Sequence, residues 1–129
     1  MPWDNLGTTW PAFWTYNSEN NWPLDGEIDI LEGIGGTMVY NVITLHTRDG
    51  CWMQNKDWIY FTGQWAPDEG GKINATNCYV NATGKAANGT YGVKFNNAGG
   101  GVFVMEWERE KFIRMWIFMR GSVPSDITL

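Results

Sequence analysis

The alternation of apolar and acidic residues over positions 27–32 predicts a β-strand with two different faces. Side chains along a strand point alternately to opposite faces, so Glu27 and Asp29 share one face while Ile28 and Ile30 share the other. A helix would separate the two acids, because about 3.6 residues per turn sends positions i and i+2 to nearly opposite sides. The segment therefore predicts a strand that packs its isoleucines on a core and presents carboxylates on its other face.

Glu32 extends this acidic face only if the strand is irregular. It lies five residues after Glu27, so in a regular strand its side chain would turn to the apolar face. A β-bulge near Leu31 would insert one extra residue and return Glu32 to the side of Glu27 and Asp29. The alternative is a solvated strand face that happens to be acidic. Like charges on one strand repel, however, and such repulsion is usually tolerated for function.

Other short apolar runs predict further strands, separated by Gly-, Asn- and Asp-rich turns. The last two runs predict a β-hairpin; a helix over 106–120 is the alternative, but Trp, Phe and Ile dominate there rather than strong helix formers. The stretch 51–89 is polar and is expected to be loop-like, with one weak strand at 58–61. The other expected strands are residues 10–15, 40–47, 102–107 and 111–119.

The composition agrees with an all-β fold in one domain. Of 129 residues, 16% are aromatic and 16 are glycine, and long runs of helix-favouring residues are absent. The formal net charge is −5 with the basic residues scattered, which disfavours nucleic acid as a partner and suits a neutral ligand. No apolar run is long enough to span a membrane, so no membrane association is expected.

Two cysteines and three glycosylation sequons indicate an extracellular protein. Cys51 and Cys78 are expected to form a disulfide, and Asn-x-Thr sequons begin at Asn74, Asn81 and Asn88. The alternatives are free thiols and sequons that arise by chance in an Asn- and Thr-rich loop. The chain opens directly in polar sequence without a signal peptide, so the alternatives are a cytosolic protein and a piece of a secreted protein that lacks its true start; the second is expected.

Residues 26–33 read Gly-Glu-Ile-Asp-Ile-Leu-Glu-Gly and resemble the Glu-x-Asp-x-x-Glu signature of glycoside hydrolase family sixteen, the laminarinase and lichenase family. Further segments resemble fungal laminarinase-like members of that family, in the same order along the chain. They are W-P-A-F-W at 10–14, N-W-P at 21–23, T-L-H-T at 44–47, M-E-W at 105–107, W-I-F at 116–118 and R-G-S-V-P-S-D-I at 120–127.

The resemblance implies a β-jelly-roll sandwich, of the kind that lectins and glucanases share, whose concave sheet forms a glucan cleft. It implies endo-acting, retaining hydrolysis of β-1,3 or mixed β-1,3/1,4 glucans by double displacement, so the expected partner is a β-glucan polysaccharide. Glu27 is then the nucleophile, Asp29 its assistant and Glu32 the general acid/base. Asn41 is a further candidate for positioning a glutamate or a sugar. No cofactor and no catalytic metal are expected, and the sequence leaves a structural calcium ion open.

Histidine and tryptophan residues around the acids are candidate substrate-binding groups. His46 is the only histidine, and within T-L-H-T it resembles the family's cleft histidine rather than an ordinary half-buried strand residue. Trp22 and Trp14 flank the acid strand in sequence and could stack on sugar rings, although a Trp in a sandwich is often part of the core. Trp107 and Trp116, in later strands, are expected to be core residues.

Two other functions use the same residues. A transglycosylase of the same family would transfer the glycosyl group to a sugar acceptor with the same three acids. A non-catalytic carbohydrate-binding sandwich would need the Trp residues but no acid row. The family domain is longer than this chain, so residues 1–129 are expected to be a partial catalytic domain that lacks N-terminal and C-terminal strands. Such a piece is expected to be inactive and to aggregate by itself, and the complete protein to be a monomer.

Overall fold

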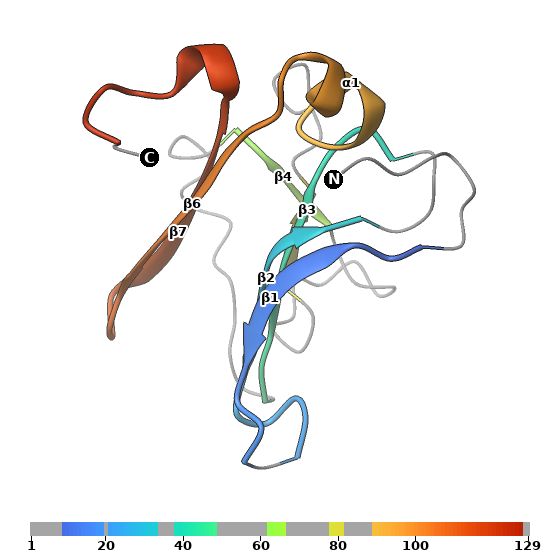
Figure 1. The fold of residues 1–129 in the computed structure, drawn as a ribbon. Helices are drawn as coiled ribbons and strands as arrows, with labels where there is room; N and C mark the ends of the chain where they lie inside the picture. The colour runs from blue at the N-terminus through green and yellow to red at the C-terminus, as the bar shows by residue number, and fades with distance from the viewer. Residues whose placement is uncertain are drawn as a thin grey trace.

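The computed structural model describes residues 9–19, 21–33, 38–48, 62–66, 78–81 and 89–127, which form two antiparallel sheets (Figure 1). One sheet has five strands in the order β1-β2-β3-β5-β4, and the other is the hairpin β6-β7. The strands are β1 (Ala12–Tyr16), β2 (Glu27–Glu32), β3 (Val42–His46), β4 (Gln64–Ala66), β5 (Cys78–Asn81), β6 (Gly101–Glu108) and β7 (Phe112–Met119). A short helix α1 (Gly92–Asn97) precedes the hairpin, and a 3₁₀ turn η3 (Arg120–Ser122) follows it.

The strands predicted from alternation and from apolar runs are confirmed, whereas β4 and β5 correct the expectation that 51–89 is loop-like, and α1 is an element that the sequence analysis did not predict. β4 and β5 contain three and four residues, too few to show a period of their own, and β5 pairs along one edge of β3. α1 has only six residues, among which Lys94 alone is a strong helix former, and its Phe95 packs against Phe103 of β6 with ring centroids 5.5 Å apart. Tertiary contacts rather than local sequence therefore account for these elements.

Several expected features fall on residues that the structure does not describe. Cys51, Asn74, Asn88 and the weak strand at 58–61 lie outside the described residues. Cys78 begins β5 and Asn81 ends it, so the middle sequon starts at the end of a strand. The disulfide and glycosylation at all three sequons stay predictions. Among the described residues, neither helical segment has the length and apolar character required to cross a bilayer.

The predicted bulge is present in β2. Asp29 pairs with Thr44 of β3, but the next pair is Glu32 with Val42, so β2 contains one more residue than β3 over this interval. The register between β1 and β2 shifts in the same way. Leu31 lies within the irregular interval, as the five-residue spacing between the glutamates required.

The end of β2 is packed against the segment 89–92, which comes from far along the chain. Tyr91 is only 3% exposed, and its ring lies so close to Gly33 that a Cβ added there would overlap the ring. The backbone N–H of Gly89 donates to the carbonyl of Val39 at 2.8 Å. The segment 89–92 therefore contacts both Gly33, directly after β2, and Val39, shortly before β3.

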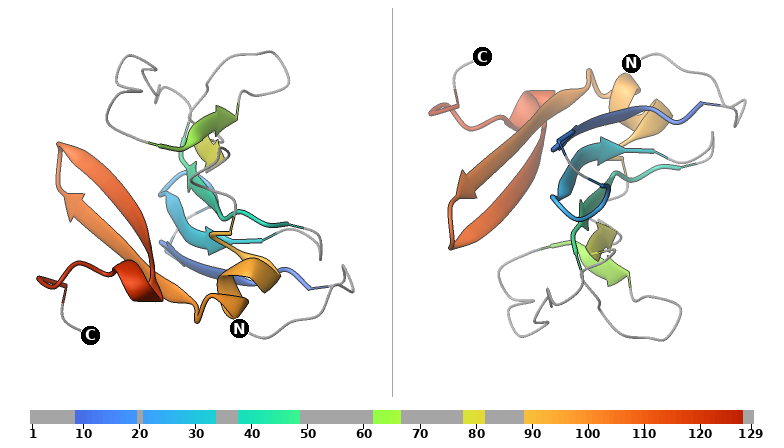
Figure 2. Two further views of the ribbon diagram at one scale, coloured as in Figure 1. Left: turned by 90° about the horizontal axis from the view of Figure 1, so that it is seen from above. Right: turned by 90° about the horizontal axis from the view of Figure 1, so that it is seen from below.

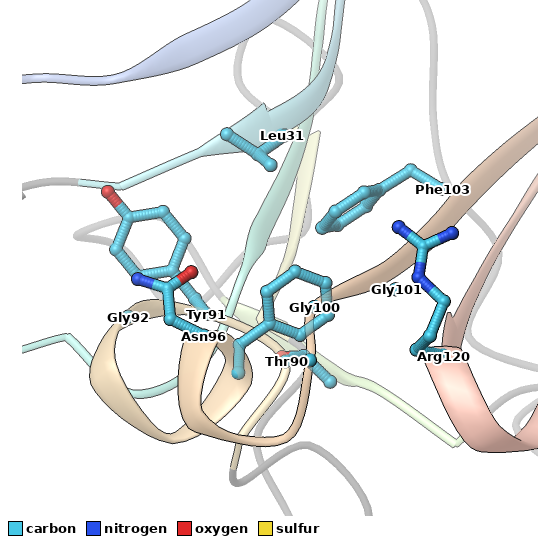
Figure 3. Close-up of a pocket in the computed structure, with 11 residues that line it drawn as sticks. Leu31, Thr90, Tyr91, Gly92, Asn96, Gly100, Gly101, Phe103 and Arg120 are labelled. Carbon is cyan, nitrogen blue, oxygen red and sulfur yellow. The ribbon is translucent and has the colours of Figure 1, made fainter. Parts of the chain in front are cut away.

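The hairpin corrects the expectation that two of its tryptophans are core residues. Trp107 and Trp116 are 64% and 37% exposed. Among the described residues, β6 and β7 form a sheet by themselves, and Figure 2 shows that this sheet diverges from the five-stranded one. An open cavity of about 560 Å³ lies where the two sheets approach, with Leu31, Tyr91, Phe95, Phe103 and Arg120 among its lining residues (Figure 3).

Candidate active site

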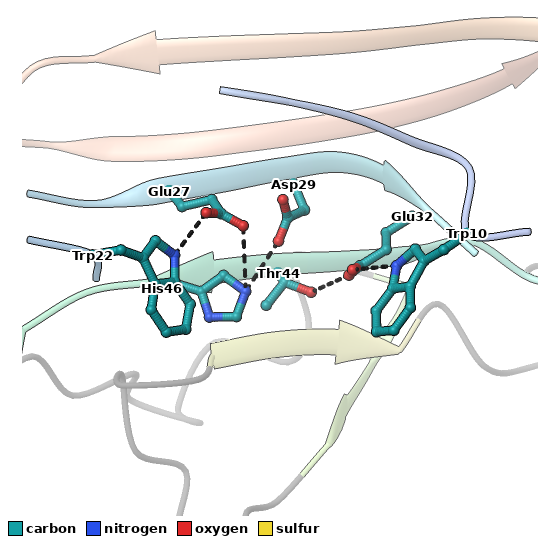
Figure 4. A network of polar contacts seen from close by, with 7 residues as sticks. All are labelled: Trp10, Trp22, Glu27, Asp29, Glu32, Thr44 and His46. Atoms are coloured by element: carbon teal, nitrogen blue, oxygen red, sulfur yellow. Dashed lines mark hydrogen bonds and ion pairs between the residues drawn. The ribbon is translucent and has the colours of Figure 1, made fainter. Parts of the chain in front are cut away.

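The three predicted carboxylates lie together on one face of β2, in a row between β1 and β3 (Figure 4). Glu27, Asp29 and Glu32 line one shallow cavity with Trp10 and Trp14, and none of these residues lines the larger cavity where the two sheets approach. Asp29 is 2% exposed, whereas both glutamates are partly accessible. The bulge thus produces the carboxylate row that the sequence predicted.

Glu27 contacts groups from three parts of the chain. Trp22 Nε1 donates a hydrogen bond to Glu27 Oε2 at 2.7 Å, and His46 Nε2 lies 3.8 Å from Glu27 Oε1. Burial raises the pKa of Glu27, and the charge of Asp29 and a hydrogen bond with its carboxyl raise it further. The Trp22 hydrogen bond and the charge of His46 lower this pKa, but the net direction is upward.

Asp29 is the buried member of the row. His46 Nε2 lies 3.2 Å from Asp29 Oδ2, yet this oxygen accepts no hydrogen bond from the described residues. The imidazole is therefore close enough to Asp29 for an ion pair when it is protonated.

Glu32 is held by two donors that the sequence analysis did not identify. Trp10 Nε1 donates to Glu32 Oε1 at 2.8 Å, and Thr44 Oγ1 donates to Glu32 Oε2 at 3.2 Å. Thr44 lies two residues before His46 on β3, so both face the acid row from the same strand. This spacing within T-L-H-T was the available signal for Thr44, whereas no periodicity indicated the contact of Trp10.

Three tryptophans around the row are exposed rather than part of the core. Trp22 is 60% exposed, and its ring centroid lies 5.3 Å from that of His46. Trp14 is 44% exposed and stacks on Tyr16 at 4.8 Å, while Trp10 is 62% exposed. Trp22 contacts the glutamate at one end of the row and Trp10 the glutamate at the other, so aromatic surfaces flank both ends of the carboxylates.

The cluster of Glu27, Asp29 and His46 has the composition of a small cation site. These residues offer two carboxylate oxygens and an imidazole nitrogen, all within 4.8 Å of one another. Carboxylate and imidazole ligands suit divalent transition metals. The same arrangement also shares protons between coupled groups, as acid–base sites do. The raised pKa of Glu27 favours an acid–base site over a cation site.

Comparison with known proteins identifies relatives along the whole chain. The family model of the XgeA-like, catalytic GH16 domain matches residues 1–129. The chain is 43% identical to the probable glycosidase C21B10.07 of Schizosaccharomyces pombe, over 93% of the chain and 28% of that protein. It is 41% identical to the endo-1,3(4)-beta-glucanase xgeA of Emericella nidulans, over 99% of the chain and 19% of that protein.

Solved structures give the same result. A mutant laminarinase 16A that cyclizes laminariheptaose matches with a TM-score of 0.72 and 35% identity, over 96% of this chain and 41% of that one. The GH16 laminarinase 16A from Phanerochaete chrysosporium, with β-glucans in both donor and acceptor sites, matches with the same TM-score, 0.72. These likenesses confirm the all-β jelly-roll fold class. The chain spans less than half the length of each of these relatives.

Proposed function

Because the chain belongs to the XgeA-like group of the family-16 glycoside hydrolases, we propose that it carries the catalytic acids of a retaining endo-β-1,3(4)-glucanase. The observation that carries the proposal is the row of Glu27, Asp29 and Glu32 on one accessible face of β2. Two carboxyl groups that flank the scissile glycosidic bond, one to attack the anomeric carbon and one to protonate the leaving oxygen, are what double displacement requires. The laminarinase 16A structures and the named glucanases support a β-glucan as the substrate class.

In the first step, Glu27 is the nucleophile and Glu32 the acid. A carboxylate oxygen of Glu27 attacks the anomeric carbon as the bond from that carbon to the leaving oxygen breaks, which gives a glycosyl-enzyme. Glu32 donates its proton to the leaving oxygen. Asp29 lies between the two glutamates, and its charge raises the pKa of Glu27.

The second step reverses the role of Glu32. Its carboxylate removes a proton from a water molecule, and the water oxygen attacks the anomeric carbon and releases Glu27. Two inversions at the same carbon retain its configuration. Thr44 and Trp10 keep both oxygens of Glu32 hydrogen-bonded at 3.2 and 2.8 Å, which fixes the carboxyl for both proton transfers.

The exposed tryptophans suit the apolar faces of sugar rings. A pyranose stacks its C–H faces on aromatic planes, and Trp offers the largest such plane. Trp22 and Trp10 each donate the indole N–H to a glutamate, and each residue stays more than half exposed. Trp14 lines the cavity between them. We infer that these rings hold glucosyl units on either side of the bond that is cleaved.

Product analysis of the full-length protein tests the proposal. We expect reducing sugar from laminarin and lichenan but not from agarose, with the β-anomer formed first in a ¹H NMR time course. The α-anomer as the first product would contradict the retaining mechanism, and release from agarose alone would contradict the substrate class. A fluorescent laminari-oligosaccharide added as acceptor separates hydrolysis from transfer, which matters because a mutant of the related laminarinase 16A cyclizes laminariheptaose.

Trp22→Phe is expected to move the acid limb of the pH–rate profile to higher pH. Glu27 must be ionised to attack, so kcat/KM falls as the pH drops through the pKa of Glu27. The Trp22 hydrogen bond lowers that pKa, and its loss lets burial raise the pKa further. A hydrogen bond to a charged group contributes about 1.5 kcal/mol. Its loss is therefore expected to displace the acid limb by about one pH unit.

Trp14→Phe is the matched control for this measurement. Trp14 lines the same cavity, but its ring stacks on Tyr16 rather than donating to Glu27. Its replacement is expected to raise KM for glucan and to leave the acid limb where it is in the wild type. An acid limb that does not move in Trp22→Phe would mean that Glu27 is not the group whose ionisation controls attack.

A further inference from the structure

The side chain of Asn41 joins the two ends of the bulge in β2. Asn41 immediately precedes β3 and is fully buried, with 0% of its surface exposed. Its Nδ2 donates to the carbonyl oxygen of Ile30 at 2.9 Å, and its Oδ1 accepts a hydrogen bond from the backbone N–H of Glu32 at 3.0 Å. One amide therefore bonds the backbone on both sides of Leu31.

These two bonds replace sheet pairing that the bulge removes. An extra residue in one strand interrupts the ladder, so backbone groups beside it lose their partners on the neighbouring strand. Ile30 is only 6% exposed, and a buried carbonyl without a donor is unfavourable. An amide side chain carries a donor and an acceptor at its end, so Asn41 can satisfy the carbonyl of Ile30 and the N–H of Glu32 at once.

Asn41 is itself anchored to a distant part of the chain. Its backbone N–H donates to Thr90 Oγ1 at 2.9 Å, and Thr90 is 8% exposed. Tyr91, the next residue, packs its ring against Gly33 directly after Glu32. Thr90 and Tyr91 line the larger cavity and the acids line the other one, so this anchor is separate from the glucan-facing side (Figure 3).

We propose that Asn41 is a positioning residue for the general acid/base, because it fixes the bulge that turns Glu32 onto the face of Glu27. The inference rests on the proposed function, in which Glu32 transfers the proton. Without the amide, β2 loses the bonds that distinguish the bulged strand from a regular one, and a regular strand would point Glu32 away from Glu27. Proton donation to the leaving oxygen should suffer first, while attack by Glu27 depends on Trp22 and His46.

The test compares substrates that differ in their need for a proton. For Asn41→Ala in the full-length protein, kcat/KM on laminari-oligosaccharides is expected to fall about 100-fold, and on a 2,4-dinitrophenyl β-laminaribioside less than about tenfold. Glu32→Gln should show the same split. In the Glu32→Gln background, Asn41→Ala should lower kcat/KM on laminari-oligosaccharides little further, because the two residues act on one step.

Val42→Ala is the matched control for lost stability. Val42 is the next residue, is 7% exposed and pairs with Glu32 in the sheet, but its side chain makes no bond to the bulge. This variant is expected to lower Tm while it changes kcat/KM on the two substrates by equal factors. Asn41→Asp keeps an acceptor for the N–H of Glu32, so the difference in kcat/KM between the two substrates should be smaller than for Asn41→Ala. This variant tests the inference if Asn41→Ala does not fold.

The outcomes separate this inference from the proposed function. If Glu32→Gln shows the split but Asn41→Ala and Asn41→Asp lower both substrates equally, the positioning role is overturned and the acid role of Glu32 stands. If Glu32→Gln itself lowers both substrates equally, the acid/base assignment fails, and the positioning role fails with it. A split in the Asn41 variants that is absent from Val42→Ala supports the inference.

Discussion

Replacing Glu27 with Gln is expected to lower glucan hydrolysis by a factor on the order of 10⁴ or more, because it removes the nucleophile. The amide keeps the shape of the side chain and can still accept the hydrogen bond from Trp22, which donates at 2.7 Å in the wild type. Binding depends on the aromatic surfaces and not on nucleophilicity. The dissociation constant for laminarin should therefore stay within about tenfold of wild type, as measured by calorimetry on the inactive variant.

A covalent label gives an independent measurement of the same role. A 2-deoxy-2-fluoro glucosyl substrate with a good leaving group should accumulate as a glycosyl-enzyme, and mass spectrometry should locate the sugar on the peptide that contains Glu27. Glu108→Gln is the matched control, since Glu108 is an exposed glutamate at the end of β6, 3.5 Å from Lys111. Its activity should equal that of the wild type. Hydrolysis by Glu27→Gln within tenfold of wild type would refute the assignment.

The sequence predicted the acid strand and its irregularity because both follow from the direction of side chains. Alternation places Glu27 and Asp29 on one face, and the five-residue spacing to Glu32 requires one extra residue. The observed register shift after Asp29 is that extra residue. Strand periodicity is a local property, so a single chain segment was enough to predict it.

The partners of the acids could not be predicted in the same way, because they depend on which strands become neighbours. The contact of Trp10 with Glu32 spans 22 positions, and the bond between Asn41 and Thr90 spans 49. No local pattern encodes such pairs. The exposure of Trp107 and Trp116 has a similar origin, because a hairpin buries its residues only where another layer packs on it.

Unlike Glu27→Gln, Glu32→Gln is expected to lose activity in proportion to how much the leaving group needs a proton. Loss of a general acid costs a factor on the order of 10²–10⁴ when the leaving oxygen must be protonated, as in laminarin. A dinitrophenolate leaves without a proton, so kcat/KM on the aryl glycoside should stay within about tenfold of wild type. The alkaline limb of the pH profile on this substrate should also flatten, because no group then has to hold a proton for the first step.

The second step gives the decisive contrast between the two glutamates. Without Glu32, water is not activated, so the glycosyl-enzyme should accumulate and kcat on the aryl glycoside should be limited by its breakdown. Azide needs no general base, so it should accelerate turnover of Glu32→Ala and give a glycosyl azide of retained, β configuration. Neither effect is expected for Glu27→Gln, which cannot form the intermediate. A Glu32 variant that loses activity equally on both substrates and does not respond to azide would show that Glu32 is not the acid/base.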